Sequence, residues 1–153
     1  MAAEIRIEEA TEVSEELMAA MAGLVGQLSR SSPPPSAAEV EEIVGSPGSY
    51  LLLARDADGT IVGTLTLALF RIPTGLRAWI EDVVVDQAAR GRGVGAALTN
   101  AAIRLANHHG ARTVDLTSRP DREAANRLYQ RLGFVRRETN VYRFEGPPPP
   151  ATE

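Results

Sequence analysis

The sequence predicts an α/β (α+β) domain, in which a mixed, mostly antiparallel sheet of six to seven strands is flanked by about four helices. Three observations predict this class: short apolar or alternating runs typical of strands, apolar residues that repeat at helical spacing, and short turns between them. The length of 153 residues fits one domain. We expect that domain to span residues 1–146, and the proline-rich residues 147–153 to form a disordered tail.

Seven segments carry a strand pattern. The expected strands are residues 5–7, 50–55, 60–70, 79–85, 113–117, 134–135 and 141–144. Asp58-Gly59, between the second and third segments, is a dipeptide typical of a tight hairpin turn. Pro73 and Gly75 mark the turn that follows the third segment.

Apolar residues repeat at helical spacing in four other segments. The expected helices are residues 13–28, 36–44, 94–109 and 125–132. We expect Thr11 to cap the first helix, and Ser36 with Glu39 to form a capping box at the second. His108 and His109 lie in the last turn of the third helix, where imidazoles interact with the helix C-terminus. We expect no metal at these histidines, because the sequence offers no third ligand nearby.

The composition excludes several classes of function. The chain has no cysteine, which excludes disulfides, thiol nucleophiles and cysteine-ligated zinc. A net charge of −4 without blocks of like charge predicts no nucleic-acid partner. The start of the chain lacks the continuous apolar segment of a signal peptide, and no apolar run could span a bilayer. We therefore expect a cytoplasmic protein with no membrane partner.

The segment Arg90–Ala96 carries the strongest functional pattern. Its glycines stand at alternate positions, which lets successive backbone N–H groups point at one anion at the start of the following helix. Arg90 and Arg92 add positive charge at the rim. This combination favours a site for a pyrophosphate group.

Two other interpretations of this segment stay open but are less favoured. Gly91-x-Gly93-x-x-Ala96 also satisfies the dinucleotide-binding fingerprint, and Asp115 lies near the spacing of a ribose-binding acid. In that fold, however, the glycines follow the first strand, whereas here several strands precede them. The other alternative is a glycine-rich turn without a ligand. A P-loop is excluded because no Gly-Lys-Ser/Thr follows.

The same segment resembles a known family. Residues 80–85 and 90–96 together are similar to motif A of the GCN5-related N-acetyltransferases (GNAT), Gln/Arg-x-x-Gly-x-Gly/Ala, in the register Arg90, Gly93, Gly95. Residues 126–134, which end in Gly133-Phe134, look like the second motif of that family. Each motif alone is weak, but together they are specific, and the resemblance extends over about residues 5–144.

The resemblance implies acetyl-CoA as the co-substrate. Main-chain groups of Val83 and Val85 would then pair with the pantetheine arm, and an N–H near Val83 would polarise the thioester carbonyl. The N–H groups from Arg92 through Ala96 would hold the pyrophosphate. The implied cofactor-binding residues are Val83, Val84, Val85, Arg90, Gly91, Arg92, Gly93, Val94, Gly95, Ala96, Asn126 and Tyr129.

The reaction also requires groups that move protons. An alkylammonium has a pKa of about 10.4 and must lose a proton before it attacks. Glu81 is the family-like base, with Asp82 facing the other side of the sheet and a water chain as alternatives. Either acid could instead pair with an arginine. Asp115 is a further candidate for substrate binding, or for a similar arginine pair.

On the last helix, Tyr129 is the expected proton donor to the departing thiolate, since a phenol pKa of about 10 is close to that of a thiol, about 8.5. Asn126, three residues earlier, would hydrogen-bond the pantetheine. The alternatives are a core aromatic for Tyr129 and a solvated helix residue for Asn126. Trp79 is expected to cover the sheet rather than to stack on a substrate.

The predicted function is N-acetylation of a primary amine in a small molecule or peptide, by direct attack on acetyl-CoA within a ternary complex and without a metal. The absence of cysteine and of an activated serine disfavours an acyl-enzyme step. The alternative is a regulatory domain that binds acetyl-CoA without turnover. The sequence does not identify the acceptor or the acyl-chain preference, and a homodimer stays open. Acceptor selectivity would depend on segments 29–37, 71–77 and 139–142.

Overall fold

The structure is a computed structural model, and it describes residues 4–147. The elements in chain order are β1 (Arg6–Glu9), α1 (Glu15–Leu28), α2 (Ala37–Gly45), β2 (Ser49–Arg55), β3 (Ile61–Ile72), β4 (Gly75–Val85), the 3₁₀ turn η1 (Gln87–Ala89), α3 (Val94–His108), β5 (Thr113–Asp115) and α4 (Glu123–Arg131). The tail predicted over residues 147–153 lies, apart from Pro147, outside the described residues.

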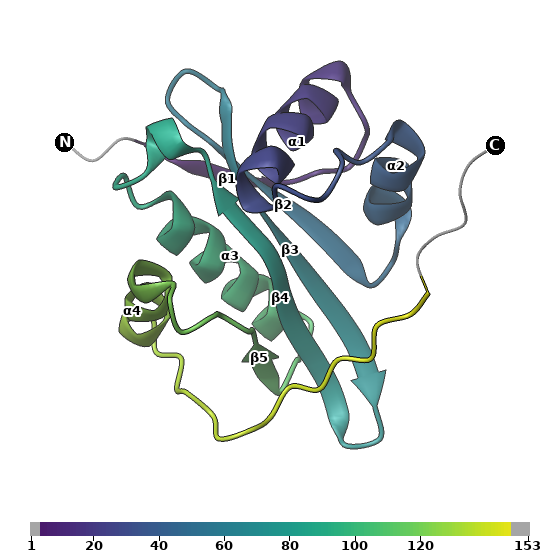
Figure 1. The fold of residues 1–153 in the computed structure, drawn as a ribbon, viewed down its shortest axis with the longest axis vertical. Coiled ribbons are helices and arrows are strands. Elements are labelled where there is room, and N and C mark those ends of the chain that lie inside the picture. Colours follow the sequence, from purple (N-terminus) through teal and green to yellow (C-terminus); the bar gives the residue numbers. More distant parts are fainter. Residues whose placement is uncertain (1–3, 148–153) are drawn as a thin grey trace.

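The five strands form one sheet in the order β1-β2-β3-β4-β5, as Figure 1 shows. Successive strands pair antiparallel, except that β4 and β5 are parallel. The chain reaches β5 through α3, which is the crossover that a parallel pair requires. The predicted mixed, mostly antiparallel class with four α-helices is therefore confirmed for the described residues.

The predicted count of six to seven strands is too high. Residues 134–135 and 141–144 form no strand, and β5 ends at Asp115 instead of residue 117. The apolar side chains of these C-terminal segments are exposed, with Val135 at 82% and Phe144 at 95%. Strand propensity depends on packing against a neighbouring strand, and no strand pairs with these segments in the described part of the chain.

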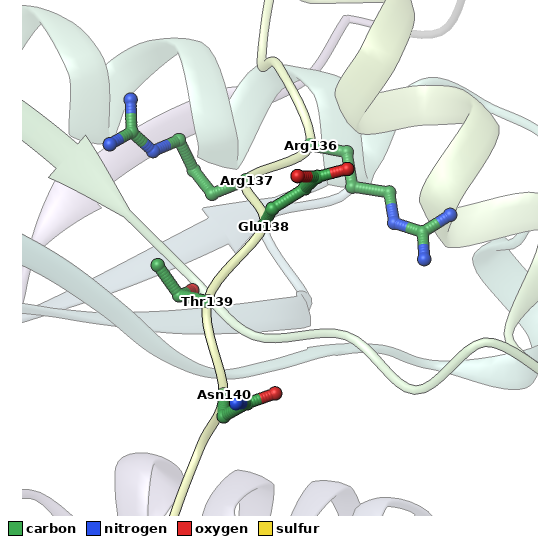
Figure 2. A pocket seen from close by; sticks show the side chains of 5 residues that line it. All are labelled: Arg136, Arg137, Glu138, Thr139 and Asn140. Carbon is green, nitrogen blue, oxygen red and sulfur yellow. The ribbon is translucent and has the colours of Figure 1, made fainter.

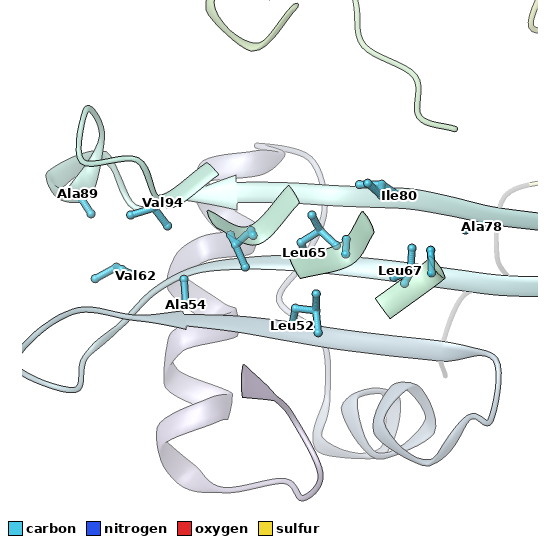
Figure 3. Packing of buried hydrophobic residues seen from close by; sticks show 12 residues of the cluster. Leu52, Ala54, Val62, Leu65, Leu67, Ala78, Ile80, Ala89 and Val94 are labelled. Atoms are coloured by element: carbon cyan, nitrogen blue, oxygen red, sulfur yellow. The ribbon is translucent and has the colours of Figure 1, made fainter. Parts of the chain in front are cut away.

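The two faces of the sheet carry two separate apolar clusters. On one face α3 covers Leu52, Leu65 and Ile80, and Figure 3 shows this cluster around the inward side chains of β2, β3 and β4. On the other face α1 and α2 cover the alternate residues of β2, Leu51 and Leu53. This alternation follows from the period of two in a strand. The candidate functional residues described below lie on β4, on the turn that follows it and on α4.

The helix caps differ in how well they were predicted. The capping box at α2 is confirmed: Glu39 N donates to Ser36 Oγ at 3.2 Å and Ser36 N donates to Glu39 Oε1 at 2.9 Å. The Thr11 cap is wrong, because Ser14 Oγ accepts from Leu17 N instead. Ala10 N still bonds to Leu51 O, which holds the chain beside β2 until just before residue 11.

A β-bulge interrupts β4 in its second half. Thr64 pairs with Val84 while Thr66 pairs with Glu81, so β4 has one residue more than β3 over this stretch. Asp82 lies in the bulge with a φ of 49°, the left-handed region in which aspartate and asparagine are tolerated better than most residues. After the bulge the alternation shifts by one, so Val84 packs under α1 and α2.

Candidate active site

The glycine-rich turn connects β4 to α3 through two left-handed residues. Gly91 has a φ of 81° and Gly93 has a φ of 80°, a conformation that other residues adopt only at a cost. Gly93 is also the N-cap of α3, and no side chain caps this helix end. Val94 is 1% exposed in the core cluster and anchors the turn to the sheet.

The N-terminus of α3 presents backbone donors to the outside. The first backbone bond of the helix joins Ala97 N to Gly93 O at 3.0 Å. The N–H groups of residues 94–96 therefore have no acceptor within the helix, and none among residues 4–147. Open space surrounds Gly91 and Gly93, where an added Cβ would meet no atom within 4 Å. This geometry suits an anion.

Two arginines border these donors. Arg90 and Arg92 are exposed, and neither pairs with a carboxylate in the part of the chain that the structure describes. Their charges are therefore available to a bound anion and add to the positive end of the α3 dipole. All seven residues of the predicted segment Arg90–Ala96 thus lie at one place, as expected.

Gly95 lies where α3 meets α4 and the end of β4. A Cβ at this position would be 3.3 Å from Leu128 Cδ2 and 3.8 Å from Val85 Cγ2. A Cβ at this position would require Leu128 to move by a few tenths of an ångström, whereas the distance to Val85 is an ordinary contact. Glycine at this position therefore permits the close packing of α4 on α3.

Strand β4 has an open edge beside β5. The parallel ladder contains three pairs, from Arg77↔Thr113 to Trp79↔Asp115. Beyond Trp79, β4 continues to Val85 with β3 on one side and no strand of residues 4–147 on the other. Unpaired backbone groups of such an edge can pair with an extended ligand. Val83, Val84 and Val85 lie on this stretch.

Glu81 is exposed, and it projects from the same face of β4 as Trp79 two residues earlier. Trp79 Nε1 donates to Glu81 Oε1 at 2.7 Å. Among the described residues the Glu81 carboxylate makes no ion pair with an arginine. Asp82 is also exposed, whereas Asp115 is half-buried and accepts a weak bond of 3.4 Å from Thr113 Oγ1.

Tyr129 of α4 packs against Phe134, with ring centroids 5.8 Å apart at 67°. Burial raises the pKa of the Tyr129 phenol above its ordinary value, and the nearby Arg122 charge only partly opposes this rise. The phenol is therefore protonated at neutral pH. Tyr129 therefore makes an aromatic contact, as in the core-aromatic interpretation, and also carries the proton that the donor interpretation requires.

Asn126 uses its side-chain amide inside its own segment. Its Nδ2 donates to Arg119 O at 2.9 Å and to Arg122 O at 2.8 Å. The Asn126 side chain therefore holds the loop before α4. The N-terminus of α4 has no side-chain cap. Both amide hydrogens are occupied in this arrangement, so only the carbonyl oxygen Oδ1 can bind a ligand, and it would do so as an acceptor.

Gln27 contributes to the site although no sequence pattern indicated it. Its Oε1 accepts from Gln87 N at 2.9 Å and its Nε2 donates to Asp86 Oδ1 at 3.2 Å. The C-terminal end of α1 is thereby tied to the turn that leads into the glycines. Fifty-nine residues separate Gln27 from Asp86, so local spacing contains no sign of this contact.

A hollow of about 510 Å³ lies along the extended chain that follows α4. Its lining consists of Arg136, Arg137, Glu138, Thr139 and Asn140, and Figure 2 shows Arg136 and Arg137 extending to opposite sides of this chain. This hollow adjoins the segment predicted to influence acceptor selectivity, and it is lined mainly by polar and charged side chains.

A model of the acetyltransferase (GNAT) family matches residues 14–134, which include β2–β5, the glycine-rich turn and α4. The chain belongs to the GNAT family of acetyltransferases. The resemblance carried by Arg90, Gly93 and Gly95 is thereby confirmed. The match ends at Phe134, the last residue of the second motif and the residue that packs on Tyr129.

Individual relatives agree with this membership. A putative acetyltransferase from Agrobacterium tumefaciens is 25% identical with a TM-score of 0.81, covering 92% of this chain and 99% of that one. The CoA complex of aminoglycoside N-acetyltransferase AAC(6')-Iy is 20% identical with a TM-score of 0.78, covering 95% and 97%. At that identity the likeness concerns the fold alone.

Among curated proteins, mycothiol acetyltransferase from Paenarthrobacter aurescens is 48% identical over 92 residues, which are 59% of this chain and 28% of that protein. Across the five curated GNAT relatives the alignments cover between 20% and 47% of the relative's length.

Within residues 4–147 no three His, Cys, Asp or Glu side chains are grouped as metal ligands would be. No helix in the same range is long and apolar enough to cross a membrane.

Proposed function

We propose that this GNAT protein transfers the acetyl group of acetyl-CoA to a primary amine, by direct attack within a ternary complex. One observation carries the proposal. The unpartnered N–H groups at the start of α3 come after a short turn, residues 86–93, that follows the strand with Glu81 and an open edge. An anion-binding turn and a place for an extended arm are therefore adjacent along the chain.

The chain offers groups for each part of acetyl-CoA. Residues 94–96, with Arg90 and Arg92, bind the pyrophosphate through backbone donors and charge. The open edge of β4 at Val83–Val85 pairs with the pantetheine amides. Asn126 accepts a hydrogen bond from a pantetheine N–H through Oδ1, since its own amide hydrogens are already bonded.

Glu81 and Tyr129 move the protons. Glu81 accepts a proton from the ammonium form of the acceptor, directly or through water, and the neutral amine then attacks the thioester carbon. A C–N bond forms, the C–S bond breaks, the CoA thiolate departs, and the second N–H proton of the attacking amine leaves through water. Tyr129, which is protonated at neutral pH, donates a proton to that sulfur and regains one through water.

The acceptor is proposed to be a cationic small molecule or peptide. The ladder between β4 and β5 ends at Asp115 of β5, and β4 carries Glu81 and Asp82 just beyond that point. These three carboxylates place negative charge around the open edge. The relative named for mycothiol supports a small-molecule acceptor. We further propose a cytoplasmic location and no requirement for metal, nucleic acid or membrane.

Thiol release provides a direct test. The chain has no cysteine, so a thiol reagent reports CoA without a signal from the protein. Acetyl-CoA is incubated with polyamines, amino acids, aminoglycosides and peptides, and calorimetry measures CoA affinity separately. We expect at least one amine to be turned over, and Glu81→Gln to lower kcat by about a hundredfold or more, the usual size of a general-base effect.

Asp58→Asn is the matched control, because it removes an exposed carboxylate in the β2–β3 turn, and it should leave turnover unchanged. An equal loss in both variants would contradict the role of Glu81. CoA binding without turnover of any amine would favour the regulatory alternative. No affinity for CoA or its acyl forms would overturn the whole proposal.

A further inference from the structure

Trp79 and Glu81 form a short side-chain hydrogen bond on β4. The N···O distance of 2.7 Å is at the short end of the range for a donor and a charged carboxylate. Both residues lie on β4 and share one face, and the residue opposite Trp79 on β3 is Ala68. A methyl group leaves room for the indole beside Glu81.

The bulge leaves Glu81 without a regular neighbour further along the strand. Asp82, in the bulge, has a φ of 49°. The next residue on the face of Glu81 is Val84, three positions after Glu81, and it is buried under α1 and α2. Trp79 is the one side chain of residues 4–147 that hydrogen-bonds Glu81. The orientation of this exposed carboxylate is therefore set by the indole.

From this arrangement we propose that Trp79 is the positioning residue of Glu81. The indole N–H occupies Oε1 and leaves Oε2 for the ammonium proton of the acceptor. An indole N–H only donates and does not titrate in the range of amines and carboxylates, so it orients the acid without competing for the proton. This inference rests on the proposed base role of Glu81.

Kinetics test the consequence for catalysis. Trp79→Phe keeps an aromatic ring over Ala68 and removes the donor. We expect kcat to fall about tenfold, as for the loss of one hydrogen bond to a charged group, with the KM for acetyl-CoA unchanged. The double variant Trp79→Phe/Glu81→Gln should be no slower than Glu81→Gln alone, because Trp79 acts only through Glu81.

Spectroscopy tests the contact without any turnover. Trp79 is the only tryptophan, so a ¹⁵N-labelled sample gives a single indole N–H resonance. Glu81→Ala removes the acceptor and should move this resonance and speed its exchange with water. Asp82→Asn is the matched control, since it changes the adjacent acid at a φ that asparagine tolerates, and it should leave the resonance in place.

The outcomes separate this inference from the proposed function. An indole resonance that is the same in Glu81→Ala and the unaltered protein overturns the contact, whether or not Trp79→Phe folds. Amine turnover with an unchanged kcat in Trp79→Phe overturns the positioning role while the acetyltransferase activity stands. A shifted resonance together with no turnover of any amine places the failure in the proposed function instead.

Discussion

Tyr129 is a partly buried phenol that packs against Phe134 and is protonated at neutral pH. An ordinary tyrosine has a pKa of about 10, and burial moves the Tyr129 pKa further up by disfavouring the phenolate. A proton donor to a thiolate needs its proton at working pH. An ordinary tyrosine already meets this condition, and burial extends the pH range over which Tyr129 stays protonated while making it a weaker acid.

Replacing this phenol should slow the chemical step. Tyr129→Phe keeps the edge-on contact with Phe134, so the fold and CoA affinity should stay nearly unchanged. We expect kcat to fall by about tenfold to a hundredfold, towards the lower end of general-acid effects. Single-turnover kinetics and calorimetry measure the two quantities separately. An unchanged single-turnover rate would remove Tyr129 from the mechanism.

At the scale of elements, α1 and the glycine-rich turn act together. Ser14 caps the start of α1, and Gln27 near its other end bonds to Asp86 and Gln87. The helix that covers one face of the sheet thus also holds the chain that enters the anion site. The placement of the backbone donors of α3 then depends on a side chain from a different element.

Removing this tie should weaken cofactor binding. Gln27→Ala deletes two hydrogen bonds to the turn, each worth about 0.5–1.5 kcal/mol, and should raise the Kd for CoA several-fold with little change in kcat. Ser14→Ala is the control on the same helix, because it costs about 1 kcal/mol of stability without touching the turn. If both variants bind CoA equally well and only lose stability, Gln27 has a structural role alone.

At the scale of the whole molecule, Arg55 ties four parts of the fold together. From β2 it bonds to Glu8 on β1, to both carboxylate oxygens of Glu16 on α1, and to Gly59 O in the β2–β3 turn. Hydrogen bonding from Arg55 lowers the pKa of Glu16 below its ordinary value. Neither pairing was visible as a sequence pattern, because the partners are 47 and 39 residues away.

The pKa shift of Glu16 predicts a direction for stability against pH. A carboxylate whose pKa is lower in the folded state stabilises the fold above its unfolded pKa of about 4.3, and this contribution is lost as the pH falls through the folded pKa. Urea unfolding from pH 7 to pH 3 should therefore show the unaltered protein more stable than Glu16→Gln at pH 7, with the two converging at the acid end. A constant difference across this range would contradict the linkage.

Local patterns predicted much of the fold and the conformation of the glycine-rich turn. The capping box of Ser36 and Glu39, the Asp58-Gly59 turn and the start of α3 at Gly93 depend on residues within a few positions of each other. Their conformational preferences act before any tertiary contact forms. The roles assigned to Glu81, Tyr129 and Asn126 stay predictions.

Pairings between distant segments decided the rest. The C-terminal segments 134–135 and 141–144 have apolar patterns like those of real strands, yet a strand forms only where a neighbour satisfies its backbone and covers its side chains. The same holds for the bulge at Asp82, the Trp79 contact with Glu81 and the bonds of Gln27. Their free energy depends on atoms that only the folded chain brings together, so tertiary structure alone could assign them.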